Sequence, residues 1–156
     1  MNLRPILIHP DPRLKKVAEP VARITPEIEA LAADMLATMY DAPGVGLAAP
    51  QVGVLSRIFV MDATRDPEAE KQPMVLINPE IDWLSEAQNT YDEGCLSIPD
   101  QYAEVTRPAE VRMRWRDISS RPKCEIRPTW IRARSFLRQS LTRFSTARLL
   151  RFSSMS

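Results

Sequence analysis

The stretch EGCLSIP, from Glu93 to Pro99, contains the side chain of this sequence that is best suited to chemistry. A thiolate at Cys95 could bind a metal ion or attack a carbonyl carbon. The preceding glycine lets the backbone approach a ligand closely. If Cys95 ligates a metal ion, the backbone N–H of Leu96 becomes a donor that could face an oxygen developing negative charge.

A second unusual stretch, GVGLAAPQ from Gly44 to Gln51, is apolar where a connection between elements would ordinarily be polar. Its backbone N–H and C=O groups need partners, so we expect another molecule to bind against it. The carboxamide of Gln51 is a donor that could face the same oxygen as the Leu96 N–H. Together the two stretches predict a site that hydrolyses an amide bond.

One helix and several strands are expected to position these stretches. Thr25 as a cap, Pro26 in the first turn and apolar residues at helical spacing predict a helix that ends near Asp41. Strands are predicted at residues 57–61, 74–79 and 110–115. An extended arm is predicted at residues 6–21, because prolines punctuate it. A helix plus strands without regular βαβ alternation predicts an α+β fold with largely antiparallel strands.

Charge is distributed unevenly along the chain. With 156 residues, 44% hydrophobic and 26% charged, the chain suits a single globular domain. Residues 1–120 contain 12 Lys and Arg against 19 Asp and Glu, a formal charge of −7, whereas residues 121–156 contain nine against one, a charge of +8. The sequence therefore predicts a domain over 1–120 and a basic tail over 121–156. Apolar residues at helical intervals predict that the tail is helical from about residue 130.

Three blocks of the sequence, in order, resemble the peptide deformylase family: HPDPRLKKVAEPV near the start, then GVGLAAPQ, then EGCLS. Members of this family remove the formyl group from the N-terminal formylmethionine of new bacterial polypeptides by metal-dependent hydrolysis. Both motifs match without a mismatch, and their order makes chance agreement improbable. The resemblance covers residues 1 to about 118 and implies a peptide-deformylase-like α+β fold with an N-terminal helix.

The resemblance also implies roles for individual residues. Cys95 would supply a thiolate ligand to Fe²⁺ or a similar divalent ion. Gln51 and the Leu96 N–H would stabilise the tetrahedral oxyanion. The substrate, an N-formylmethionyl peptide, would lie extended like an added strand. The groove that holds it would be lined by Val45, Gly46 and Glu93.

Family members carry a third motif, His-Glu-x-x-His on a core helix, whose imidazoles ligate the metal and whose Glu acts as general base. This sequence has no such motif, and its one histidine is His9, which we expect at the surface. The core helix is therefore expected to be replaced by the unrelated basic segment. A lone thiolate leaves the other tetrahedral positions to water, so we expect the metal not to be retained and the enzyme to be impaired or inactive.

The tail has two alternative interpretations. Out-of-frame reading of a GC-rich gene yields Arg, Ser, Thr and Ala with few acids, which predicts a frameshift product. Alternatively, the chain is a non-catalytic deformylase-like binder whose tail contacts RNA or the ribosome through phosphates. Arginines interrupt the apolar face of the tail, so no membrane partner is expected. No DNA partner is expected either. Since no apolar run approaches roughly 18 residues and no signal pattern is present, a cytoplasmic location is expected.

Overall fold

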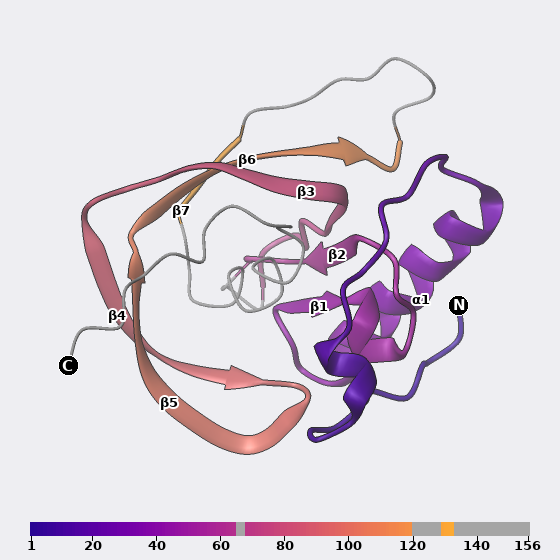
Figure 1. Ribbon diagram of the computed structural model, residues 1–156, viewed down its shortest axis with the longest axis horizontal. Helices are drawn as coiled ribbons and strands as arrows, with labels where there is room; N and C mark the ends of the chain where they lie inside the picture. The colour runs from indigo at the N-terminus through magenta and orange to yellow at the C-terminus, as the bar shows by residue number, and fades with distance from the viewer. Residues whose placement is uncertain (65–67, 120–128, 133–156) are drawn as a thin grey trace.

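The computed structural model describes residues 1–64, 68–119 and 129–132 of the chain (Figure 1). Its helices are the 3-10 helix η1 (Pro12–Lys15), the α-helix α1 (Pro26–Asp41) and the 3-10 helix η2 (Ala49–Val52). Its strands are β1 (Gly46–Ala48), β2 (Ile58–Met61), β3 (Met74–Leu84), β4 (Gln88–Cys95), β5 (Ile98–Pro108), β6 (Glu110–Asp117) and β7 (Thr129–Arg132). In this described part, no helix is long and apolar enough to cross a membrane.

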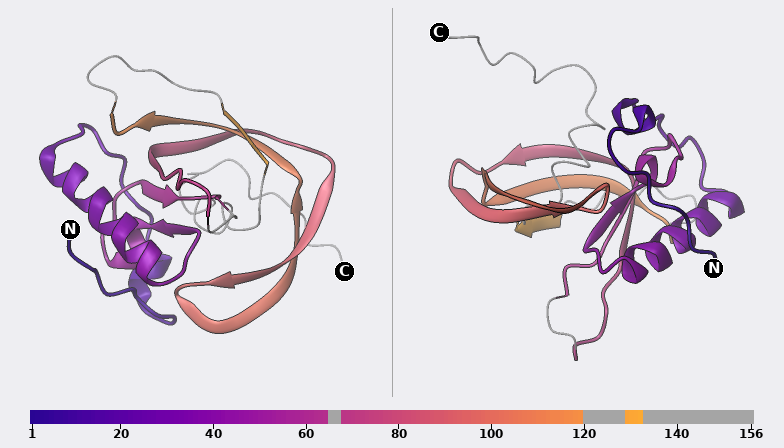
Figure 2. Two further views of the ribbon diagram at one scale, coloured as in Figure 1. Left: turned by 180° about the vertical axis from the view of Figure 1, so that it is seen from behind. Right: turned by 90° about the horizontal axis from the view of Figure 1, so that it is seen from below.

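All paired strands run antiparallel. A five-stranded sheet has the order β1-β2-β3-β6-β7, and β4 pairs with β5 in a separate two-stranded sheet. Because β3 leads into β4 and β5 leads back into β6, these strands form one long ribbon that bends between the two sheets (Figures 1 and 2). At the bend, the Ser85 N–H donates to the Glu110 carbonyl (3.0 Å) and the Ala109 N–H to the Ala87 carbonyl (2.7 Å). The predicted α+β fold with mostly antiparallel strands is confirmed.

The predicted N-terminal helix is confirmed as α1. Thr25 is extended at its N-cap, and Pro26 occupies the first turn, where a missing N–H costs nothing. Its buried face, which includes Met35 and Met39, packs against β1 and β2 (Figure 2). After the helix ends, the Gly44 N–H donates to the Met39 carbonyl at 2.8 Å. The end of α1 is thus tied directly to the start of the GVGLAAPQ stretch.

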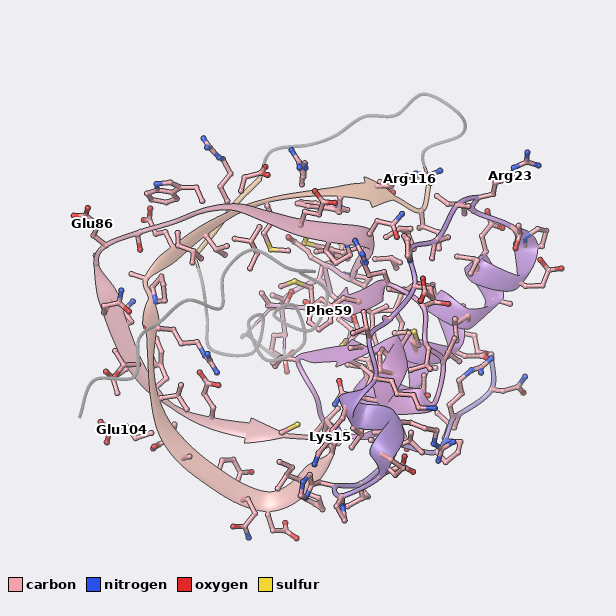
Figure 3. The ribbon with its side chains drawn as sticks, in the orientation of Figure 1. Lys15, Arg23, Phe59, Glu86, Glu104 and Arg116 are labelled. Atoms are coloured by element: carbon pink, nitrogen blue, oxygen red, sulfur yellow. The ribbon has the colours of Figure 1, made fainter. Side chains whose placement is uncertain are left out.

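Strand β2 is buried on both faces and separates two apolar clusters. Ile58 and Val60 belong to the cluster under α1, whereas Phe59 and Met61 belong to the cluster that includes β6. Figure 3 shows the Phe59 ring near the centre of the molecule. Burial on both faces explains why the sequence of β2 is a continuous apolar run. Since β1 pairs with β2, this core supports the GVGLAAPQ stretch from one side.

The predicted strands are present, with differences in extent. β3 continues past the predicted end at residue 79 to Leu84, and β6 continues to Asp117. The strands β4 and β5 were not predicted, because most of their residues are exposed and show no apolar alternation. The arm predicted to be extended contains η1, whose N-cap Asp11 accepts a hydrogen bond from the Arg13 N–H. The cap and Pro12 in the first turn explain this short helix.

The start of the predicted tail helix is wrong. Residues 129–132 form β7, which pairs with β6 at the edge of the five-stranded sheet. Backbone pairing with the open edge of β6 outweighs a weak helical pattern, and Thr129, Trp130 and Ile131 are residues that favour strands. The rest of that predicted helix, the boundary at Ser120 and the expected replacement of the core helix lie outside the described residues.

Candidate active site

The two motifs singled out in the sequence meet through the side chain of Gln51. Gln51 lies in η2, immediately after β1, and its Oε1 accepts a hydrogen bond from the Ala48 N–H at 2.9 Å. Its Nε2 donates to the Ser97 Oγ at 3.1 Å, across 46 residues of sequence. Because a backbone N–H can only donate, Oε1 must face Ala48 and Nε2 must face Ser97. The orientation of the carboxamide is therefore defined by its partners.

The EGCLS motif forms the tip of the β4–β5 hairpin. Cys95 is the last residue of β4 and pairs with Ile98, so Leu96 and Ser97 make a two-residue turn. The register shifts between Gly94 and Cys95, which places extra residues of β5 in a bulge. Cys95 is half-buried with a free thiol, whereas Ser97 is only 4% exposed. The hairpin thus brings Ser97, which follows Cys95 and Leu96 in the motif, into contact with Gln51.

Two glycines of the motifs are closely approached by side chains of the protein itself. A Cβ at Gly44 would lie 2.6 Å from the Leu96 Cδ1, so the Leu96 side chain would have to move to accommodate it. A Cβ at Gly94 would lie 2.9 Å from the Cε1 of Tyr102. The sequence suggested that Gly94 permits close approach of a ligand, but the group that approaches it in the structure is this tyrosine ring.

The N-terminal arm holds both motifs, a feature that the sequence did not predict. The Leu7 N–H donates to the Gln51 carbonyl at 2.7 Å, and the His9 N–H donates to the Ser97 carbonyl at 2.8 Å. The His9 side chain is exposed, as expected. The signal that could have suggested this arrangement is the family-like block HPDPRLKKVAEPV, whose role cannot be derived from local pattern alone.

Val45 precedes β1 and is exposed, whereas Gly46, the first residue of β1, is buried. Val45 is 44% exposed, and its carbonyl accepts a hydrogen bond from the Asp62 N–H at 3.1 Å. Gly46 pairs with Met61, and β1 is an edge strand of the sheet as described. An edge strand offers free backbone groups to an extended peptide. This arrangement is compatible with the predicted groove.

The Asp62 carboxylate organises the chain behind Val45. It accepts hydrogen bonds from the Tyr40 hydroxyl (2.6 Å), the Thr64 N–H (2.9 Å) and the Gln72 N–H (3.1 Å). Burial opposes ionisation of Asp62, but these hydrogen bonds prevail and lower the pKa of its carboxyl. Burial, and then the bond to Asp62, raise the pKa of Tyr40 to about 12. Asp62 thus closes the loop after β2 and stays ionised.

Glu93 is buried and paired with Arg107 across the β4–β5 ribbon. The Arg107 Nε and Nη2 donate to its two carboxylate oxygens at 2.6 and 2.9 Å. The Glu93 side chain is 3% exposed and the Arg107 side chain 16% exposed. A bidentate buried pair of this kind fixes the ribbon beside Cys95. Contact between Glu93 and a peptide stays a prediction.

The described side chains around Cys95 do not make a site that suits a divalent metal ion. Within residues 1–64, 68–119 and 129–132, no three His, Cys, Asp or Glu side chains come together as a candidate metal site. Glu93, two residues from Cys95 on β4, is engaged by Arg107. His9 is the only histidine of the sequence, so two imidazole ligands cannot be supplied by this chain. Among the described residues, Cys95 does not by itself make the usual ligand set of a hydrolytic ion.

The fold and the joined motifs are those of a hydrolase family that comparison with known proteins identifies. The family model described as Polypeptide deformylase matches residues 3–139. The peptide deformylase of Rhizobium meliloti (strain 1021) is 54% identical over 117 residues, which cover 75% of this chain and 67% of that protein. The chain belongs to the peptide deformylase family. The family match extends to residue 139, further than the expected limit at about 118.

Solved structures agree with this assignment. A crystal structure of a peptide deformylase from Legionella pneumophila has a TM-score of 0.73 and 38% identity, over 90% of this chain and 77% of that chain. A Met-Ala-Ser-bound crystal structure of the class I type b peptide deformylase from Acinetobacter baumannii has a TM-score of 0.74 and 30% identity, over 83% of this chain and 84% of that one. The deformylase-like fold is therefore confirmed. Membership of the family implies a divalent metal ion and action on formylmethionyl nascent peptides.

Proposed function

We propose that this chain has the substrate site of a cytoplasmic peptide deformylase, and that its hydrolytic activity is impaired. The observation that carries the proposal is the Gln51 carboxamide, held at 3.1 Å from Ser97 beside the Cys95–Leu96 turn. This arrangement places a carboxamide donor and a turn N–H at the junction of the two motifs. Two such donors suit the oxygen of a formyl group as it becomes an oxyanion.

The donors contribute by stabilising charge. In this proposal the Gln51 Nε2 and the Leu96 N–H donate to the formyl oxygen as the tetrahedral intermediate forms. Loss of one such donor typically reduces kcat by about 10²–10³-fold. The carboxamide is already held by Ala48 and Ser97, so little reorganisation is needed when substrate binds.

The peptide is proposed to bind along the edge of β1. Val45 and Gly46 would pair with its backbone, and Glu93 would border the groove from the ribbon. The position of β1 at the edge of the sheet and the exposure of Val45 support this. A relative was crystallised with Met-Ala-Ser bound, which supports a peptide as the ligand class. Backbone pairing gives affinity without strong demands on the peptide sequence, which suits a substrate class defined by its N-terminus.

The missing part of the site is the metal and the general base. Fe²⁺ or a related ion would supply an activated water when bound, and Cys95 would be its thiolate ligand. Because the sequence offers no pair of imidazoles, we propose that the ion is not retained. The general base of the His-Glu-x-x-His motif is lacking too, and such catalysis is typically worth about 10²–10⁴-fold.

The test combines metal analysis with formate release. Purified chain and the peptide deformylase of Rhizobium meliloti should be assayed side by side with a formyl-Met peptide in the presence of Fe²⁺, Ni²⁺ and Zn²⁺. We expect less than stoichiometric metal in this chain and formate release lower by at least about 10²-fold, the lower limit for lost acid–base catalysis. Stoichiometric metal with formate release at the relative's rate would overturn the proposal.

The origin of the basic tail has a direct test. We propose a frameshift, because the charge of the chain reverses near Ser120 and the sequence beyond it has nine basic residues against one acid. Resequencing the gene should reveal an adjacent reading frame that encodes His-Glu-x-x-His in the same stretch of DNA. A neighbouring frame without this motif would rule the frameshift out.

The basic composition of the tail also supports a second candidate, a non-catalytic binder that contacts RNA at the ribosome. Replacing Arg138, Arg143 and Arg148 by Gln in the full chain tests it. If all three contact phosphates, the slope of log K against log salt for single-stranded RNA should decrease by about 2. Equal slopes for both chains would exclude this binding mode.

A further inference from the structure

We infer that Ser97 is the positioning residue for Gln51: its hydroxyl holds the carboxamide so that one N–H is bound and the other is aimed at the formyl oxygen. Gln51 Oε1 is held by the Ala48 N–H at 2.9 Å, and Nε2 is held by the Ser97 Oγ at 3.1 Å. The inference rests on the proposed function, since that function supplies the oxygen. It assigns a role to Ser97, which is neither a proposed metal ligand nor a proposed oxyanion donor.

Planarity of the carboxamide makes two hydrogen bonds sufficient. An amide group has one acceptor oxygen and two N–H hydrogens in one plane. Fixing Oε1 and one hydrogen therefore fixes the direction of the second hydrogen. Among the described residues, Ser97 Oγ is the acceptor that the structure gives to Nε2. Without it, rotation about the last side-chain torsion would be limited only by the Ala48 bond, since that torsion has broad wells.

Ser97 is itself held by the N-terminal arm and by its own hairpin turn. Its carbonyl accepts from the His9 N–H at 2.8 Å, and it lies in the turn closed by the Cys95–Ile98 pair. The same arm holds the Gln51 backbone through the Leu7 N–H at 2.7 Å. The arm, η2 and the hairpin are therefore joined at one point, which fixes the Leu96 N–H relative to the Gln51 carboxamide.

Burial makes the Ser97 hydroxyl consequential. The residue is 4% exposed, so water has little access to replace its oxygen if the hydroxyl is removed. A serine with a different environment provides the matched control. Ser85 Oγ accepts from the Glu110 N–H and donates to the Ala87 carbonyl, and it lies at the bend of the ribbon, away from Gln51.

The test is the side-chain NH₂ signal of Gln51 in ¹H–¹⁵N NMR spectra of the full chain. The signal is assigned by its disappearance in Gln51→Glu. In the wild type we expect two well-separated proton shifts and a nuclear Overhauser contact from one of them to the Ser97 Hβ protons. Ser97→Ala should collapse the separation to that of an exposed glutamine, Ser97→Thr should restore it, and Ser85→Ala should leave it unchanged.

The outcomes decide the inference independently of activity. An unchanged Gln51 signal in a folded Ser97→Ala chain, or a wild-type spectrum without the contact to Ser97, would overturn it. If Ser97→Ala does not fold, the wild-type contact and the Ser97→Thr spectrum still decide. Adding a formyl-Met-Ala-Ser peptide should shift only the hydrogen that does not contact Ser97. If the Gln51 hydrogens are fixed but do not respond to saturating peptide, the proposed function is refuted, and so is the direction of the second hydrogen toward a formyl oxygen. The bond between Gln51 and Ser97 would still stand.

Discussion

The two halves of the candidate site differ in completeness. The carbonyl-binding half, built from the arm, η2 and the hairpin tip, is joined by hydrogen bonds from Ala48, Leu7 and His9. For the proposed metal-binding half, Cys95 is the ligand that we propose, and the residues that the structure describes contain no group of three candidate ligands. The comparison teaches that the two functions depend on different parts of the chain. The proposed oxyanion site is built from segments before residue 100, whereas no candidate set of three metal ligands is found among the described residues.

The largest loss of stability is expected from Glu93→Gln, in the strand that ends at Cys95. The change leaves the Arg107 guanidinium buried without its ionic partner, which typically costs about 3–5 kcal/mol in free energy of unfolding. Denaturant unfolding measures it. The matched control is Glu80→Gln, whose pair with Arg114 is about half exposed on both sides and should cost about 0–1 kcal/mol. Equal costs for the two variants would show that burial of the Glu93 pair does not matter.

A smaller effect is expected from Gly44→Ala, on the carbonyl-binding side. The new methyl would lie 2.6 Å from the Leu96 Cδ1; because this atom ends a flexible, half-buried side chain, we expect a cost at the low end of overpacking, about 1 kcal/mol. Thermal or denaturant unfolding measures the cost. In the double variant Gly44→Ala/Leu96→Ala the clash is removed, so the two changes should be less than additive. Strict additivity would mean that the two residues do not meet.

Acid should loosen the arm on which the carbonyl-binding half depends. A hydrogen bond from the Asn2 N–H lowers the pKa of the Asp34 carboxyl below its ordinary 3.8; burial opposes this, and Arg4 adds to the lowering. Because the folded pKa is lower, the stabilisation is present above pH 3.8 and is lost as pH falls through the folded pKa. The protection factors of the arm amides against hydrogen exchange should decrease over that range. Asp34→Asn should exchange faster at neutral pH and show no such acid step.

The smallest effect is expected at alkaline pH, behind Val45. The pKa of Tyr40 is raised from 10.0 to about 12, so its neutral form is favoured by folding. The stabilisation is present below pH 10.0 and is lost as pH rises to about 12. Ultraviolet titration should detect a late phenolate, and Tyr40→Phe should remove that late step. An unaltered titration curve in Tyr40→Phe would contradict the assignment.

Sequence reasoning succeeded where local pattern determines structure. Capping, proline placement and helical periodicity defined α1, and a continuous apolar run defined β2. The ribbon strands β4 and β5 were not predicted, because their side chains are mostly exposed and show no apolar periodicity. Their pairing depends on the turn at Leu96 and Ser97 and on a register shift that no pattern encodes.

For the site, motif matching located Gln51 and Cys95 but not the residues that hold them. The Ser97 hydroxyl was visible within EGCLS, yet its partner lies 46 residues earlier in the chain. The backbone bonds of Leu7 and His9 leave no trace in residue type, because every residue except proline carries the same N–H. The pair of Glu93 and Arg107 required knowledge of strand register. Such non-local contacts become visible only when the elements are placed in space.

The bond between Gln51 and Ser97 has a consequence for variation at these two positions. Neither residue can change its chemical type freely, since a donor at one position requires an acceptor at the other. A gene library that randomises both positions together should therefore yield folded chains with matched pairs, and randomising either position alone should return few alternatives. The two motifs would then vary together, although they are separate segments of the sequence.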